Sequence, residues 1–335
     1  INNNTKAYVR FAQESESLDQ PRGGWWGPSQ VALPTPNVQD SAGRSYSFNL
    51  VNVLGPTTTA ESLVSYSRLT LDNFYRDPSR VSKTAQGIDF EGFFPGQSPH
   101  LPLQAIHSWG GSQIGDLWSP MNDVFAYNDA LQFQHKLTKI VGTVTRLTKE
   151  QNFQNEENVQ LIFANWASGS TGNTVADMMT GKFAQAEQGT RIPIGNFRAW
   201  NFDLFAQDSW KVRPNVTLEY GLRWAYMPNN IEISGLGGVF DPSQYNPSAG
   251  TFLDPGTFQR LNGYQYAATG DVPRDLVGNR APFWMPRINL AWNIDGEGNN
   301  VLRGGYGMFV NRPMGNVEYD TTLRVPPVAY NVGVT

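Results

Sequence analysis

The stretch from Trp200 to Tyr226 constrains the fold of this chain more than any other. Its even positions are almost all apolar or aromatic, and its odd positions are mostly polar. A period of two is the pattern of β-strands with one apolar and one polar face. Arg213-Pro214-Asn215 interrupts the alternation with residues that favour a turn, because proline fixes φ and asparagine tolerates unusual backbone angles. The stretch therefore predicts a long antiparallel hairpin.

The length of the two arms favours a membrane over a soluble core. Strands of soluble domains usually have about 5–6 residues, and these arms are roughly twice as long. Trp200 and Trp210 share a face. At ~3.3 Å per residue and a tilt of ~40°, roughly 25 Å would separate them, which is the height of the apolar band between the aromatic girdles of an outer-membrane barrel. A large soluble β-sandwich is the alternative on this pattern alone.

Composition narrows the class of protein. The 335 residues suffice for one large barrel or two soluble domains, and a net charge of −4 does not suggest nucleic-acid binding. The absence of cysteine excludes disulfides, zinc–thiolate sites and cysteine nucleophiles. No run of about 18 apolar residues predicts a membrane-spanning helix, whereas barrel strands escape that test because every second residue faces a polar lumen. An aromatic content of 13%, with ten tryptophans, suits interfacial belts.

Short and long connections alternate along the chain. Short turns are expected at 55–57, 138–139, 213–215 and 295–298, and long polar connections at 15–44, 74–127, 150–198 and 228–283. Such long loops are uncommon in compact soluble domains, but this asymmetry is typical of outer-membrane barrels. We therefore expect the short turns to face the periplasm and the long connections to face outward. One long connection predicts a short helix from Thr174, with Asn173 as N-cap and Gly181 as C-cap.

Several local features modify the strand pattern. Phe205 and Asp208 break the alternation of their strand, and the glycines of 304–307 predict a bulge or a close backbone approach. Strand-like alternation also occurs at 7–11 and at 328–334, so we expect the chain to be cut from a longer barrel at both ends.

Four blocks of sequence carry a family resemblance: FAQDSWKVRPNVTLEYGLR at 205–223, MPRINLAW at 285–292, VLRGGYGMF at 301–309, and ADMMTG at 176–181. In motif and order they resemble the Oar-like TonB-dependent outer-membrane receptor and transporter family. The resemblance implies an all-β fold, a transmembrane antiparallel β-barrel of about 22 strands, in the bacterial outer membrane. We interpret residues 1–335 as a segment of that one barrel domain. The family's plug and N-terminal domains are not visible in this sequence.

The alternation assigns side chains to the two surfaces of the barrel. The predicted lipid-facing and girdle residues are Trp200, Trp210, Leu218, Tyr220, Leu222, Trp224, Tyr226, Trp284, Trp292 and Tyr306. The predicted lumen-facing residues are Asp203, Gln207, Glu219, Arg223, Arg287 and Arg303.

No arrangement of residues predicts catalysis or a cofactor. His100 and His107 near Asp116 are interpreted as solvated loop groups rather than metal ligands, because no tight ligand spacing is present; His135 is interpreted as a barrel-wall residue. The chain has no nucleophile-elbow motif in a strand-to-helix context. The acidic turn at 295–299 resembles a calcium loop only loosely, and a hairpin turn is preferred.

Two classes of function remain open. The first is a TonB-dependent transporter that takes up a bulky ligand, with outer-membrane lipid and a TonB-type energy transducer as partners. The second is a structural or adhesive barrel whose loops contact other outer-membrane or surface proteins.

Overall fold

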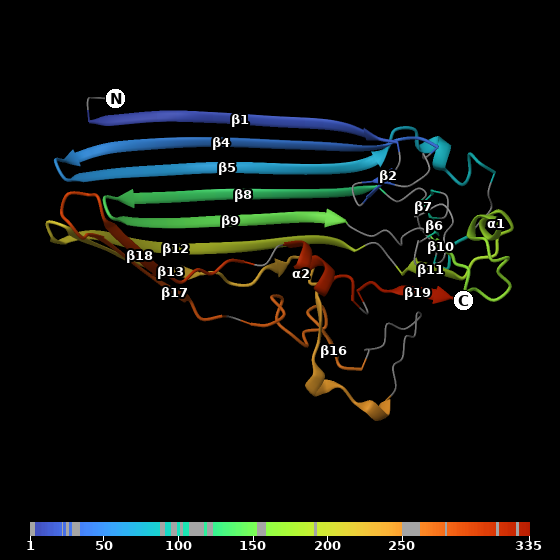
Figure 1. Ribbon diagram of the computed structural model, residues 1–335. Coiled ribbons are helices and arrows are strands. Elements are labelled where there is room, and N and C mark those ends of the chain that lie inside the picture. Colours follow the sequence, from blue (N-terminus) through green and yellow to red (C-terminus); the bar gives the residue numbers. More distant parts are fainter. Residues whose placement is uncertain are drawn as a thin grey trace.

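One large antiparallel sheet dominates the computed structural model, with smaller loop structures gathered at one end of its strands (Figure 1). The structure describes residues 4–21, 23–24, 27–28, 34–87, 91–94, 99–100, 103–106, 117–118, 123–152, 159–190, 193–249, 262–278, 280–312, 315–325 and 328–335. The sheet has ten strands in the order β1-β4-β5-β8-β9-β12-β13-β17-β18, with β14 paired to β12. Their bounds are β1 Thr5–Gln20, β4 Asn37–Gly55, β5 Thr58–Tyr75, β8 Val124–Leu137, β9 Ile140–Asn152, β12 Ile194–Arg213, β13 Val216–Tyr226, β14 Ile231–Glu232, β17 Phe283–Asn293 and β18 Val301–Gly307. Within the described residues the sheet is open, with β1 and β18 at its edges.

The predicted hairpins are confirmed, and their turns lie at one end of the sheet (Figure 1). Adjacent hairpins are tied at this end, since Thr138 N–H donates to the Thr59 carbonyl at 2.9 Å and Asn293 N–H to the Asn215 carbonyl at 2.8 Å. In the last turn the Asp295 carboxylate accepts hydrogen bonds from the backbone N–H groups of Glu297 and Gly298. Residues 295–298 therefore form the hairpin turn that the sequence favours over a calcium loop.

The strands reach much further than predicted at the opposite end. The sequence predicts a connection at 15–44, but β1 and β4 pair without interruption as far as Gln20 and Asn37, so residues 15–20 and 37–44 belong to strands. The other long connections are also shorter than predicted. Their predicted bounds are wrong because β5, β8, β9 and β12 extend into them. In β1 and β4 the residues past the apolar band are mostly polar on both faces, so the alternation is lost there while the backbone hydrogen bonds continue.

The long connections build secondary structure of their own. A five-stranded sheet has the order β19-β11-β10-β6-β7, and two two-stranded sheets pair β15 with β16 and β2 with β3. The C-terminal alternation does form a strand, but β19 pairs with β11 in this second sheet and not with the large one. The bounds are β2 Gly23–Gly24, β3 Gly27–Pro28, β6 Leu103–Ile106, β7 Leu117–Trp118, β10 Gln160–Phe163, β11 Gln185–Gly189, β15 Gly238–Phe240, β16 Tyr264–Tyr266, β19 Asn331–Val334, and the 3-10 turns η1 Pro78–Val81, η3 Pro242–Gln244 and η4 Pro247–Ala249.

The predicted short helix is α1, Thr174–Met179. The Asn173 side chain accepts hydrogen bonds from Val175 N–H and Ala176 N–H, so the N-cap is confirmed. The predicted C-cap is off by one residue: the cap is Thr180, and Gly181 follows it with a φ of 74°. Hydrogen bonds from Ser170 and Thr171 hold the pKa of the Asp177 carboxyl below its usual range. The acidic residue of the ADMMTG block therefore closes the preceding loop.

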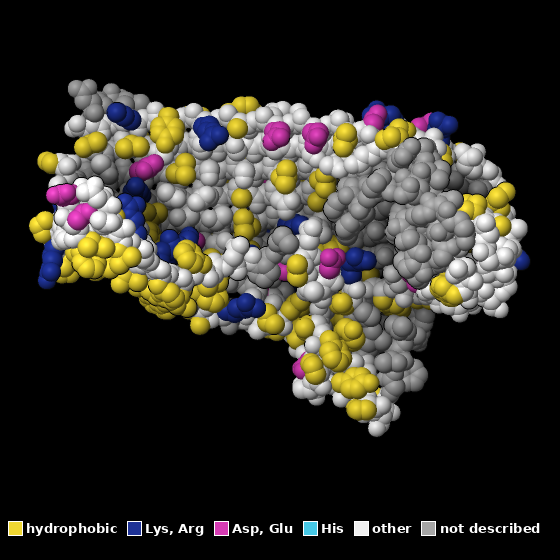
Figure 2. All heavy atoms as spheres, in the orientation of Figure 1, with side chains coloured by type: hydrophobic (Ala, Val, Ile, Leu, Met, Phe, Trp, Pro, Cys, Tyr) yellow, Lys and Arg dark blue, Asp and Glu magenta, His cyan; other side chains and the backbone are white. Residues whose placement is uncertain are grey.

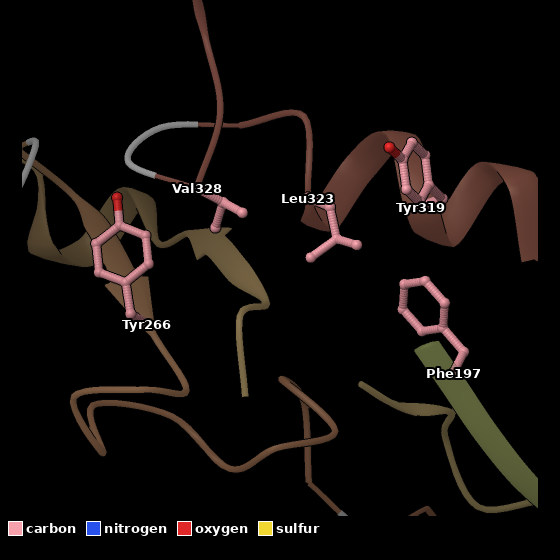
Figure 3. Close-up of a cluster of buried hydrophobic side chains, with 5 residues drawn as sticks. All are labelled: Phe197, Tyr266, Tyr319, Leu323 and Val328. Carbon is pink, nitrogen blue, oxygen red and sulfur yellow. The ribbon is translucent and has the colours of Figure 1, made fainter. Parts of the chain in front are cut away.

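A second helix, α2 (Gly315–Thr322), covers part of one face of the large sheet. Five buried side chains join it to β12 and to β16, as Figure 3 shows: Phe197, Tyr266, Tyr319, Leu323 and Val328. We call the sheet face that carries Phe197 the inner face and the opposite one the outer face. Gly195 belongs to this contact, since a Cβ there would lie 2.7 Å from Leu323 and Phe197 side-chain atoms. No helix among the described residues is long and apolar enough to cross a bilayer.

Tyr319 should hold α2 on the inner face. It is fully buried, and its hydroxyl donates to the Pro193 carbonyl at 2.6 Å. We expect Tyr319→Ala to destabilise the docked helix by about 3–5 kcal/mol and Tyr319→Phe by about 1 kcal/mol, because the second variant loses only the hydrogen bond. Hydrogen exchange of residues 315–323 measures the effect, with the exposed Tyr306→Phe as control. Unchanged exchange in Tyr319→Ala would show that other contacts hold the helix.

Candidate functional site

The two faces of the large sheet differ in chemistry along its whole width. The register places Trp224 opposite both Leu204 and Trp284, and Tyr220 opposite Ile288, so these side chains share the outer face. Of the ten predicted lipid-facing residues, seven are exposed, and Leu218, Trp224 and Tyr226 are partly so. Figure 2 shows hydrophobic side chains gathered at the lower left, where Figure 1 places β13, β17 and β18. Exposure of so many large apolar side chains marks a surface that meets something other than water.

The apolar outer face ends at one row of cross-strand neighbours. This row runs through Phe11, Tyr46, Tyr66, Leu131, Arg146 and Trp200 on β1, β4, β5, β8, β9 and β12. Phe11 and Tyr46 have ring centroids 5.0 Å apart, and the Arg146 guanidinium lies 5.9 Å from the Trp200 ring centroid. Beyond this boundary row most outer-face side chains are polar or charged, and Phe74 and Ile194 are exposed exceptions. The row has the composition of an interfacial aromatic belt.

The inner face carries the residues predicted to face the lumen. Asp203 and Arg223 form a salt bridge at 3.0 Å, which is mostly buried on the Asp203 side. The register places Glu219 opposite both Ser209 and Asn289, and Arg303 opposite Ala291, on this same face. The structure brings together only Asp203 and Arg223 among the six; Gln207, Glu219, Arg287 and Arg303 are spread along the face.

The irregular residues of the pattern now have a physical explanation. Phe205 lies on the inner face, where the Arg287 guanidinium is 5.5 Å from its ring centroid and 4.5 Å from that of Phe309. Gly305 and Gly307 face this region, and a Cβ at Gly305 would lie 2.0 Å from Asn289 Oδ1. The close approach is confirmed, whereas the bulge is not, because β17 and β18 pair in regular register.

Asp208 lies on the outer face near the turns, and Lys139 of the neighbouring turn forms an ion pair with it. The ion pair lowers the free energy needed to place the Asp208 carboxylate on the apolar outer face near the turns. The exception to the alternation is therefore a charge with a partner supplied from another hairpin, which the local sequence does not show.

Sequence reasoning missed a polar cluster between the inner face and α2. Arg312 donates to Asn201 Oδ1 and Asn230 Oδ1, each at 2.7 Å, and Asn230 donates to the Glu318 carboxylate. Burial raises the pKa of Glu318 and lowers that of Arg312, while their opposite charges counter both shifts. On β9, Lys149 hydrogen-bonds to Asn316 of the same helix. No motif joins these residues, because they come from four separate segments.

The cluster borders a hollow of about 680 Å³ on the inner face. Strands β1 to β12 line the hollow, with Lys149, Phe197, Asn230 and Arg312 near α2. A hollow lined by both polar and apolar groups suits a polar ligand of appreciable size.

The histidines form no metal site in the described part of the chain, where no group of three potential ligands occurs. His100 was predicted to be solvated, which is wrong: it is 7% exposed, packs edge-on against Tyr75, and lies 3.9 Å from Asp123. Burial lowers the pKa of His100 and raises that of Asp123. His107 and Asp116 lie outside the described residues. The ring of His135, on the outer face, is 2.9 Å from Ser62 Oγ.

Comparison with known proteins places the fold. Residues 1–335 match the family described as "Outer membrane beta barrel domain". The chain belongs to this family. Its fold is therefore an all-β, antiparallel outer-membrane barrel fold, and its location is the bacterial outer membrane.

A solved structure also resembles this chain. It is the outer membrane transporter YddB from Escherichia coli, with a TM-score of 0.43 and 8% sequence identity over 91% of this chain and 30% of that chain. The chain thus spans about a third of that transporter's length. No curated protein matched the chain.

The assignment of the outer face to lipid and the inner face to water is testable by cysteine labelling in membranes. A water-soluble thiol reagent should modify cysteines at 219 and 223 and spare those at 220 and 222. Reaction at 220 and 222 with protection at 219 and 223 would reverse the assignment.

The same assignment predicts an energetic asymmetry. Leu222→Arg should destabilise the barrel by about 2–4 kcal/mol, because it places a charge in the apolar band. Thr217→Arg, on the inner face of the same strand, should cost much less. Reversible unfolding in lipid vesicles measures both variants, and equal costs would contradict the assignment.

Proposed function

We propose that this chain is part of a TonB-dependent, ligand-gated outer-membrane barrel that takes up a bulky ligand and has no catalytic role. The outer-membrane barrel family is the observation on which the proposal rests. The Oar-like resemblance of residues 205–223, 285–292 and 301–309 adds energised transport, with a TonB-type transducer acting through segments that this sequence does not show.

The two faces of the sheet support a transport role. An apolar outer face provides the contact with lipid, and an inner face with the Asp203–Arg223 pair provides a polar wall. The hollow beside Arg312 and Lys149 presents positively charged side chains, which bonds to Asn201, Asn230 and Asn316 hold in position, to a polar ligand such as a glycan or a peptide. Function belongs to a site rather than to a fold, so this hollow is where ligand contacts should be sought first.

A structural or adhesive role is the second candidate. The arm formed by β15, β16 and the adjoining 3-10 turns extends away from the sheet (Figure 1) and exposes Phe240 and Tyr245, whose ring centroids are 6.2 Å apart. Aromatic side chains at an exposed tip are common in protein contacts. In this alternative the loops would bind other surface proteins.

The proposal fixes the sidedness of the barrel. The short turns should face the periplasm and the arm should face outward. An epitope inserted at Ser248 should be detected by antibody on intact cells, whereas the same epitope at Glu297 should require permeabilised cells. Detection of the Glu297 epitope on intact cells would reverse the topology.

Depletion of nutrients from the medium separates the two functions. Three strains are compared by mass spectrometry of glycans and peptides left in the medium: wild type, a strain without the complete protein, and a strain without the TonB-type transducer. Both mutants should leave the same compounds unused. Normal depletion by the first mutant together with altered adhesion would reject transport and support the structural role.

A further inference from the structure

A belt of arginines lies on the outer face immediately past the boundary row. Two residues beyond Tyr46, Tyr66 and Trp200, the same face carries Arg44, Arg68 and Arg198, and Arg146 lies within the boundary row. One such step is ~6.7 Å along a strand. The arginines therefore begin at the level where the apolar face ends, and they lie on four strands, β4, β5, β9 and β12, with Asp129 of β8 between them.

Arg44 and Arg68 face each other directly across β4 and β5. Like charges directly opposite each other on neighbouring strands repel, and this repulsion destabilises the sheet when no counter-ion is bound. Arg68 is held in place, since it lies 3.8 Å from Asp129 and its guanidinium is 5.5 Å from the Tyr127 ring centroid. In the described part of the chain, Arg44 and Arg198 have no ion pair or side-chain hydrogen bond. An anion beside Arg44 would relieve the repulsion.

The carboxylates of this region do not supply that anion. Asp129 already pairs with Arg68 and accepts the Tyr66 hydroxyl at 2.8 Å. Asp72 accepts the Tyr127 hydroxyl at 2.8 Å, and Glu150 accepts from Asn196 at 3.1 Å. Asp40 and Asp72 lie two rows beyond Arg44. The order along the outer face is thus apolar, then aromatic, then the arginines with Asp129 among them, and then the acidic pair Asp40 and Asp72.

We propose that Arg44 and Arg68 bind the phosphate groups of lipid headgroups in the leaflet next to this boundary. Arg146 and Arg198 extend this binding surface to the neighbouring strands. Lipid phosphates lie directly past the apolar region of a bilayer, which is the position of the belt. Arginine matches phosphate with several donors in a planar fork. The proposal rests on the outer face meeting lipid, and it does not depend on the transport role.

Native mass spectrometry of the complete protein released from bilayers tests the site. The bilayers contain phosphatidylcholine with either a diphosphorylated outer-membrane glycolipid or its dephosphorylated form. The phosphorylated lipid should remain bound preferentially. Arg44→Gln should lower its retention about fivefold, and Arg44→Gln with Arg198→Gln further, because one basic side chain near an anionic surface contributes ~1 kcal/mol.

Arg10→Gln is the matched control, because Arg10 lies one residue from the boundary row but on the inner face of β1. It should leave lipid retention unchanged. Circular dichroism and resistance to detergent unfolding confirm that each variant folds.

Three outcomes would overturn the proposal: equal retention of the two lipids, equal effects of Arg44→Gln and Arg10→Gln, or displacement of the lipid by free inorganic phosphate at low concentration. Failure of the cysteine test at 220 and 222 would instead remove the lipid contact itself. The two kinds of failure are therefore distinguishable, and both are independent of the uptake experiment.

Discussion

Backbone hydrogen bonding is the constraint on which the rest of this structure depends. A bilayer offers no water to unpaired N–H and C=O groups, so a chain that crosses it with strands must pair them across neighbouring strands. In the antiparallel sheet from β1 to β18, each strand forms backbone hydrogen bonds with its neighbours. Pairing also determines which side chains share a face, since adjacent residues of a strand point in opposite directions. The apolar outer face and the polar inner face both follow from the register.

The same pairing allows the strands to continue where the apolar band stops. β4 has 19 residues and β5 has 18, well beyond the ~9–11 that cross a bilayer. In the extension, hydrogen bonds and ion pairs between side chains such as Tyr66, Asp129 and Arg68 replace apolar packing on the outer face. The boundary row between the two regimes is where aromatic and then cationic side chains gather.

The inner face is organised by contacts between distant parts of the chain. Phe197 and Gly195 on β12 pack against Tyr319 of α2 and against Leu323, which directly follows the helix; both of these side chains are fully buried. The polar groups of Arg312 and Glu318 lie beside this apolar contact and bond to Asn201 and Asn230. Part of the hollow is therefore shaped by a connecting segment folded onto the sheet, and not by the strands alone.

The sequence by itself determined the central hairpin, its turn and its two faces, because a period of two is visible wherever one face is apolar. It also determined α1 from Asn173, since an N-cap is a local hydrogen-bonding device. It did not determine the full length of β1, β4 and β5, because a polar extension has no alternation to read. Only the tertiary structure decided the partner of Asp208, the burial of His100 and the bonds of Arg312, since each depends on residues distant in the chain. The place of β19 in the second sheet was likewise decided by its partner β11, because strand pairing is a long-range choice that the strand's own residues do not specify.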